Sequence, residues 1–399
     1  MRRSNYKHVK LKEVCDRITV GHVGPMVEHY VPHGVPFLRS LNIQPFVLAL
    51  DDVKFVSQAF HAKLNKSALK PGDVAVVRTG YPGTACVIPE GLPEANCADL
   101  VVITPSPELN PFYLAAVFNS AWGRASVAGN LVGVAQQHFN VSVAKEMEVP
   151  LPPRKVQDRI AGILSAYDEL IANNQRRIAI LEEMARALYR EWFVRYNAPG
   201  VVMGEDGVPE GWEVKPLLEL ANVTYGFPFD SKQFNADGEG TPIIRIRDIP
   251  TGATETFTEQ DAAEKYHVYD SEILVGMDGD FHMCMWSSGH AYQNQRVAKF
   301  TSRGAIGNYH LFLALEQPIQ ELNRSIVGTT VAHLGASHIK DIKVMWPTRD
   351  LAERFKAILE PMAQQQLTLK KQTANLRRTR DLLLPRLMSG RVELNTVEV

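Results

Sequence analysis

Most of the side chains in this sequence that could do chemistry are hydrogen-bonding groups in short, loop-like segments. Arginine and lysine pair with guanine edges, whereas asparagine and glutamine pair with adenine edges. In the first half of the chain, the candidates for such contacts with DNA are Arg39, Asn42, Arg78, Thr79, Tyr81, Gln136, Gln137, His138, Asn140 and Lys145. In the second half they are Arg245, Arg247, Asp248, Asp278, Asn294, Gln295, Arg296, His333, His338 and Lys340. Lys145 and Lys340 suit phosphate or solvent, and a phosphate contact fixes register without reading bases.

The segment GVAQQHFN at residues 133–140 is the strongest of these candidates, because it is rich in amide groups. The corresponding segment GTTVAHLG at 328–335 has little hydrogen-bonding capacity apart from its threonines and His333. Such a difference is expected if two domains read different sequences. Arg39 and Arg245 occupy equivalent places, where a phosphate contact and a structural salt bridge both fit.

The motifs that would make the chain an enzyme are incomplete. Asn110-Pro111-Phe112-Tyr113 comes near the motif with which adenine methyltransferases grip a flipped base, but it lacks the second proline. Gly80-Tyr81-Pro82-Gly83 lacks the spacing of a phosphate-binding loop, and no Gly-rich cofactor turn is found. We therefore predict no catalytic residue. A divergent N6-adenine DNA methyltransferase stays open as an alternative, which methyl transfer by the purified chain would support.

Composition excludes several other classes of protein. The four cysteines are scattered without a CxxC pair, which argues against zinc and disulfides and suits a reducing cytoplasm. His22, His29 and His33 have no cysteines or helical register to support a metal, so no metal site is predicted. The sequence contains no run of about 18 apolar residues, so no membrane span is predicted. The net charge of −1 counts against a simple nucleic-acid binder, so a DNA surface must come from local patches or be shared with a more basic partner.

The sequence repeats itself. The segments that begin at Gly133 and Gly328 align without a gap over 32 residues at an offset of 195, with matches that include His138/His333, Lys145/Lys340 and Pro152/Pro347. Further upstream, the Gly-x-Pro turn at Gly34 resembles that at Gly240, and each precedes a short β-type run. Each half is therefore predicted to contain short strands and turns, then proline, then a long helix.

After each of these prolines the apolar pattern changes to heptad spacing. The predicted helix seams, which are also the candidates for binding partner subunits, include Leu164, Ile171, Asn174, Ile178, Leu181, Leu188 and Trp192, and then Leu359, Leu369, Leu376, Leu383 and Leu387. Roughly 35 residues at about 1.5 Å each give a rod on the order of 50 Å long. Asn174 fits either a register-fixing seam residue or an ordinary polar residue at a helix crossing. Pro361 is expected in the first turn of the second helix, and Pro385 is expected to end or kink it.

These patterns predict an α/β (α+β) fold with two strand-rich domains in tandem. The domains span residues 1–152 and 198–347, and the long helices span 153–197 and 348–399 with the tail. If a pseudo-twofold axis relates the halves, the helices pack as an antiparallel coiled coil.

The order and duplication of these features resemble the specificity subunit of a type I restriction-modification system. The resemblance rests on the run VPLPPRKVQDRIAGIL that leads into the first long helix, the opening Pro209-Glu210-Gly211-Trp212 of the second half, and the run at Asn294-Gln295-Arg296-Val297. It covers nearly the whole chain, although each piece is short and degenerate. It implies that each strand-rich domain is a target recognition domain, which reads one half of a split site in double-stranded DNA.

The resemblance also implies that the helices set the gap between the half-sites and dock two methyltransferase subunits, which restriction (translocase) subunits then join. It implies no cofactor in this chain, with S-adenosylmethionine, ATP and Mg in the partner subunits, and no membrane. A third possibility is an adaptor that uses its helices only for assembly and has no sequence preference on DNA.

Overall fold

The computed structural model describes residues 6–92, 94–131, 138–326 and 333–390. The chain forms two compact units, which we call unit 1 (Met1–Ala172 with Asn375–Val399) and unit 2 (Asn173–Ala374). Each long helix is divided between the two units, because its two halves are buried in different cores.

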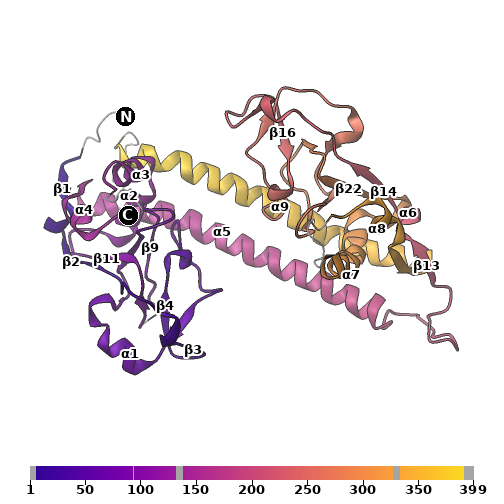
Figure 1. Ribbon diagram of the computed structural model, residues 1–399, viewed down its shortest axis with the longest axis horizontal. Helices are drawn as coiled ribbons and strands as arrows, with labels where there is room; N and C mark the ends of the chain where they lie inside the picture. Colours follow the sequence, from indigo (N-terminus) through magenta and orange to yellow (C-terminus); the bar gives the residue numbers. More distant parts are fainter. Residues whose placement is uncertain (1–5, 93, 132–137, 327–332, 391–399) are drawn as a thin grey trace. The chain divides into compact units, whose positions relative to one another are not determined.

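Unit 1 contains two four-stranded sheets (Figure 1). The antiparallel sheet has the order β2 (Cys15–Val20), β11 (Leu100–Pro105), β8 (Val74–Val77) and β9 (Ala85–Val87). The mixed sheet has the order β10 (Asn96–Cys97), β4 (Val35–Leu38), β7 (Lys54–Val56) and β3 (Tyr30–Val31). Two further pairs are β1 (His8–Lys10) with β12 (Glu148–Pro150) and β5 (Ile43–Gln44) with β6 (Val47–Leu48). Its shorter α-helices are α1 (Gln58–Lys63), α2 (Pro111–Asn119), α3 (Ala121–Ala128) and α4 (Val141–Glu146).

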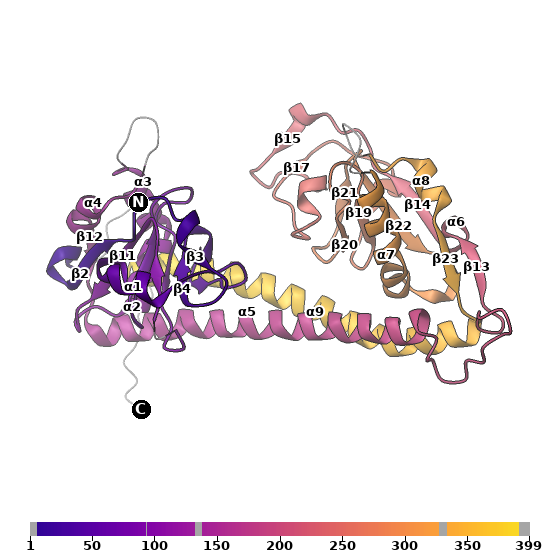
Figure 2. The same ribbon diagram turned by 60° about the horizontal axis from the view of Figure 1, so that its bottom comes forward.

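Unit 2 is built in the same way (Figure 2). Its antiparallel sheet has the order β14 (Ala221–Tyr225), β22 (Val297–Ser302), β19 (Ile273–Gly276) and β20 (Met283–Met285). Its mixed sheet has the order β15 (Phe234–Asn235), β17 (Phe257–Thr258), β16 (Thr241–Ile244), β21 (Ala291–Gln293) and β18 (His267–Val268). The strand β13 (Glu213–Pro216) pairs with β23 (Lys343–Trp346). The shorter α-helices are α6 (Leu217–Leu220), α7 (Asn308–Ile326) and α8 (Ala336–Asp341).

The strand orders match between the units, which confirms the duplication predicted from the sequence. The order β2-β11-β8-β9 corresponds to β14-β22-β19-β20, and β3-β7-β4-β10 corresponds to β15-β17-β16-β21. In each mixed sheet the corresponding pair, β4 with β10 or β16 with β21, is parallel. Equivalent positions in the two units can therefore be assigned from strand register.

The Gly-x-Pro turns explain one conserved feature of the repeat. A Cβ atom at Gly240 would lie 2.1 Å from the carbonyl oxygen of Thr258, and one at Gly34 would lie 2.3 Å from that of Val56. Both carbonyls belong to the strand that pairs with the one entered through the turn. Only glycine allows the backbones to approach so closely.

The long helices are α5 (Arg154–Tyr189), which continues as a π-helix over Arg190–Val194, and α9 (Arg349–Met388). In unit 1, Leu164 shares a core with Leu384 and Leu387, and Asp168 pairs with Arg380 at 2.6 Å. In unit 2 the two helices run antiparallel, because Glu182 pairs with Lys370 whereas Trp192, further along α5, packs on Phe355.

The residues of the predicted seam differ in burial. Leu164, Ile171, Asn174, Trp192, Leu359, Leu369 and Leu387 are buried, whereas Ile178, Leu181, Leu188, Leu376 and Leu383 are partly buried. The expectation for Pro361 was wrong, since α9 begins at Arg349, and the helix continues past Pro385 to end at Met388. Pro361 and Pro385 are exposed, so the carbonyl groups that lose a helical partner face water. Burial of Leu384 and Leu387 on either side of Pro385 favours continuation of the helix.

A cluster of rings joins α5, α7 and α9 in unit 2. The His310 ring stacks on Trp346 at a centroid distance of 4.8 Å and contacts Phe193 and Phe355 at the same distance. Its Nδ1 atom has no hydrogen-bond partner among the described residues. Burial lowers the pKa of His310 to about 3, so the folded protein holds this ring neutral.

We expect His310 to make the protein less stable in mild acid. Below its ordinary pKa of 6.5, the unfolded chain binds a proton that the folded chain does not, so stability falls as the pH drops from about 6.5 towards 3. At pH 5 the loss from this group is about 2 kcal/mol. Urea unfolding at pH 7.5 and pH 5 should therefore show a smaller difference for His310→Phe than for the wild type. The exposed His33, changed to Phe, serves as the control and should leave the difference unchanged.

Gly240 and Gly238 offer a matched test of the close backbone approach. Both have a left-handed φ, +84° and +86°, but a Cβ at Gly238 meets nothing within 4 Å. Gly238→Ala should cost about 1 kcal/mol of unfolding free energy from the backbone conformation alone. Gly240→Ala should cost at least about 2 kcal/mol more, because the strands must separate. Equal losses in chemical denaturation would contradict this role of Gly240.

Candidate nucleic-acid interface

The turns after β4 and β16 contain five of the predicted DNA contacts. Asn42 accepts a hydrogen bond from the Arg39 amide at 2.9 Å, and Asp248 accepts one from the Arg245 amide at 2.9 Å. The Asn42 and Asp248 residues are only 1% and 7% exposed. These two side chains therefore shape the turns, and they do not reach the surface at which bases would be read.

Arg39 is tied to its own unit through the carbonyl and carboxylate oxygens of Asp52, at 2.6 and 3.0 Å. Arg245 lies 3.5 Å from the Asp248 carboxylate. These ion pairs match the structural alternative considered for the two arginines. Arg247, in the same turn as Arg245, is exposed.

In unit 1 a second group of candidates meets at the ends of β8 and β11. Arg78 donates from Nη1 to Oδ1 of Asp99 at 2.8 Å and from Nε to the carbonyl oxygen of Phe139 at 3.2 Å. Thr79 donates from its hydroxyl to Oδ2 of Asp99 at 2.8 Å. Asp99 has a φ of +53°, which is uncommon for a residue other than glycine. Sequence reasoning missed Asp99, although aspartate is among the few residues that tolerate this conformation.

Unit 2 gathers three predicted residues from three separate segments. Asp278 lies 2.6 Å from Nδ1 of His333 through Oδ1, and 3.3 Å from Nε of Arg296 through Oδ2. Asn294 and Gln295 form the turn before Arg296, in which the Asn294 side chain accepts from the Gln295 amide at 2.7 Å. The structure thus brings Asp278, Arg296 and His333 into one polar cluster, with Asn294 and Gln295 in the adjoining turn.

The clusters occupy equivalent places in the two units. Asp99 directly precedes β11, and Arg296 directly precedes the corresponding strand β22. The Phe139 amide donates to the carbonyl of Arg78, as the Leu334 amide donates to that of Met277. The charge directly before the central strand is therefore reversed, because Asp99 precedes β11 in unit 1 whereas Arg296 precedes β22 in unit 2. The partners come from neighbouring positions, since Arg78 corresponds to Met277 and Asp278 corresponds to Thr79.

The remaining predicted residues have different surroundings. Tyr81 is 84% exposed in the turn between β8 and β9, and Lys145 and Lys340 are exposed on α4 and α8. The Asn140 side chain caps α4 by accepting from the Val143 amide, and His338 accepts from the Gly335 amide at the start of α8. His138 is half-buried, and Gln136 and Gln137 lie outside the described residues.

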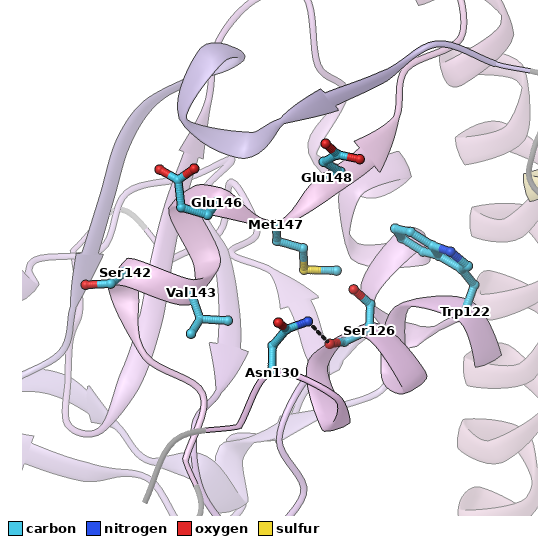
Figure 3. A pocket seen from close by; sticks show the side chains of 8 residues that line it. All are labelled: Trp122, Ser126, Asn130, Ser142, Val143, Glu146, Met147 and Glu148. Atoms are coloured by element: carbon cyan, nitrogen blue, oxygen red, sulfur yellow. Dashed lines mark hydrogen bonds between the residues drawn. The ribbon is translucent and has the colours of Figure 1, made fainter.

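Unit 1 has a cavity of about 510 Å³ between α3 and α4 (Figure 3). Its lining includes Trp122, Ser126 and Glu146. Glu146 pairs with Lys10 at 2.8 Å and Lys12 at 2.6 Å, and these bonds lower its pKa to about 2. The carboxylate therefore stays charged at neutral pH and does not suit a general acid.

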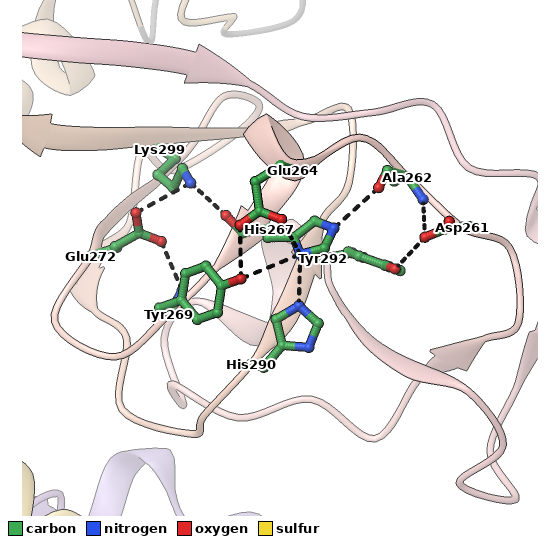
Figure 4. A network of polar contacts seen from close by, with 9 residues as sticks. All are labelled: Asp261, Ala262, Glu264, His267, Tyr269, Glu272, His290, Tyr292 and Lys299. Atoms are coloured by element: carbon green, nitrogen blue, oxygen red, sulfur yellow. Dashed lines mark hydrogen bonds and ion pairs between the residues drawn. The ribbon is translucent and has the colours of Figure 1, made fainter.

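In unit 2 a polar network joins β18 to β21, and sequence reasoning did not find it (Figure 4). Nε2 of His267 donates to the carbonyl of Ala262, and its Nδ1 lies 3.1 Å from Nε2 of His290. Burial, and then the charge of His267, lower the pKa of His290. Tyr292 donates to Asp261, and this bond holds the loop that precedes β18 against β21. The network stabilises the edge of the mixed sheet.

No helix in the described parts of the chain is both long and apolar enough to cross a membrane. The same residues contain no group of three or more His, Cys, Asp or Glu side chains placed to hold a metal ion.

Comparison with known proteins agrees with this architecture. The family model for the type I restriction modification DNA specificity domain matches residues 3–183 and 209–376. The type I restriction enzyme MjaIX specificity subunit of Methanocaldococcus jannaschii is 26% identical over 63% of this chain and 62% of its own length. The EcoBI specificity subunit of Escherichia coli is 32% identical over 46% of this chain and 40% of its own length. The alignments thus span less than two thirds of these relatives.

The fold also resembles a solved structure. The crystal structure of the type I restriction-modification system S subunit from M. genitalium superposes with a TM-score of 0.60 over 97% of each chain, at 15% identity. That likeness concerns the fold. Because the family model covers both halves of the sequence, the chain belongs to the type I restriction-modification DNA specificity family.

Proposed function

We propose that this chain is the non-catalytic specificity subunit of a type I restriction-modification complex, and that it reads a split DNA target with one unit per half-site. The observation that carries the proposal is the pairing of a shared scaffold with different exposed groups. The two units share a matching strand order, but the equivalent residues directly before β11 and β22, Asp99 and Arg296, carry opposite charges. Such a pair of domains suits two different short sequences.

The proposal includes partner subunits, because the chain has a net charge of −1 and its family is defined by DNA specificity. Methyltransferase subunits, two in number, would dock on α5 and α9 and supply S-adenosylmethionine. Restriction subunits would supply the ATP- and Mg-dependent steps. We expect weak DNA binding by the chain alone, since affinity for DNA depends largely on neutralising phosphates.

The test is methylome sequencing of a host strain that expresses the partner genes with and without this gene. We expect this gene to add adenine methylation at one split motif, made of two short defined parts separated by a fixed gap. The partner genes with an empty vector are the control. No new motif, despite assembled partners, would contradict the proposal and favour an adaptor. Methyl transfer by the purified chain alone would instead favour a divergent adenine methyltransferase.

A further inference from the structure

One equivalent position in each unit combines exposure, a rigid setting and opposite hydrogen-bonding character. The Asp99 side chain is 41% exposed, and the Arg296 side chain is 55% exposed. Each residue directly precedes the central strand of its antiparallel sheet, β11 or β22, so its backbone is fixed by strand pairing. A group held in this way can discriminate between bases, because its direction does not adapt to the wrong partner.

In unit 1 the exposed group is a hydrogen-bond acceptor. Arg78, whose side chain is only 13% exposed, and Thr79 each donate to a different oxygen of Asp99. A carboxylate oxygen accepts more than one hydrogen bond, so both oxygens keep capacity on their exposed side. In the major groove such an acceptor matches the amino group of cytosine or adenine and repels the carbonyl oxygens of guanine and thymine.

In unit 2 the exposed group is a donor. Asp278 engages Nε of Arg296 through one oxygen, and His333 takes the other oxygen. The ion pair therefore holds the guanidinium by its inner nitrogen and does not use the two terminal nitrogens. Two parallel donors of this kind match O6 and N7 of guanine.

We propose that Asp99 and Arg296 are the equivalent specificity-determining residues of the two half-sites. Asp99 reads an exocyclic amino group in one half-site, and Arg296 reads guanine in the other. The inference rests on the function proposed above and deepens it. The inference also explains why a negatively charged side chain, Asp99, lies on a surface proposed to approach negatively charged DNA. Recognition of an amino group requires a hydrogen-bond acceptor.

The experiment compares methylomes of the complete complex with partners for Asp99→Asn and Arg296→Gln. Asparagine is nearly the same size and still accepts from Thr79, but its amide also donates, so guanine or thymine becomes acceptable at one position. Glutamine matches adenine, so the Arg296→Gln complex should shift from guanine to adenine in the other half-site. On duplex oligonucleotides, discrimination at the affected position should fall on the order of 10- to 100-fold.

Matched controls are Asp16→Asn in unit 1 and Arg303→Ala in unit 2, both at exposed positions, and both should keep the wild-type motif. Urea unfolding checks that the variants fold. If Asp99→Asn does not fold, the double variant Asp99→Ala with Arg78→Met removes both members of the ion pair and takes its place. An unchanged motif in folded variants of both residues would overturn the inference while leaving the split target intact. Relaxation of the same half-site by both variants would overturn it too. Absence of a split motif in the wild type would be failure of the proposed function itself.

Discussion

The structure depends on burial of helix residues in the cores of both units. In unit 2 the cluster around Phe355, His310 and Trp192 joins the long helices to α7. In unit 1 Leu164 and Leu384 lie in the same core as β8 and β11. Because most helical stability in a protein comes from tertiary packing of an apolar face, these buried contacts rather than propensity hold α5 and α9. A strand-rich unit in turn lacks a complete core without its helix halves.

The sequence predicted the features that depend on local periodicity and repetition. The offset of 195 residues predicted that α4 and α8 are equivalent, as are α5 and α9, and the heptad spacing predicted the buried face of each long helix. It did not predict the two mixed sheets, since strands of two residues such as β10 and β18 show no alternation. It misplaced Pro361 because a local rule for proline was applied where tertiary burial determines helix length.

Only part of the candidate interface could be predicted, because the direction of a side chain, like the length of a helix, depends on the tertiary fold. Residue type identifies a side chain that can hydrogen bond, but only the fold decides whether it points inward. Asn42 and Asp248 have the chemistry of base readers, yet they close buried turns through bonds to their own backbone. Asp99 was missed because its role depends on strand register. The register of β11 with β8 places it beside Arg78, which lies 21 residues away in the chain.

The reversed ion pair shows how one scaffold can present opposite groups without loss of stability. Each unit keeps one acid and one base at the ends of its central strands, so each pair stays neutral and neither charge is left without a partner. An unpaired charge at these partly buried positions would carry a desolvation cost. Asp99 corresponds to Arg296, but its partner Arg78 corresponds to Met277, so each unit supplies the counter-charge from a different position. On the proposed role of these residues, divergence after duplication required a change at the start of the central strand together with a change in the facing turn, while the order of the antiparallel sheet stayed the same.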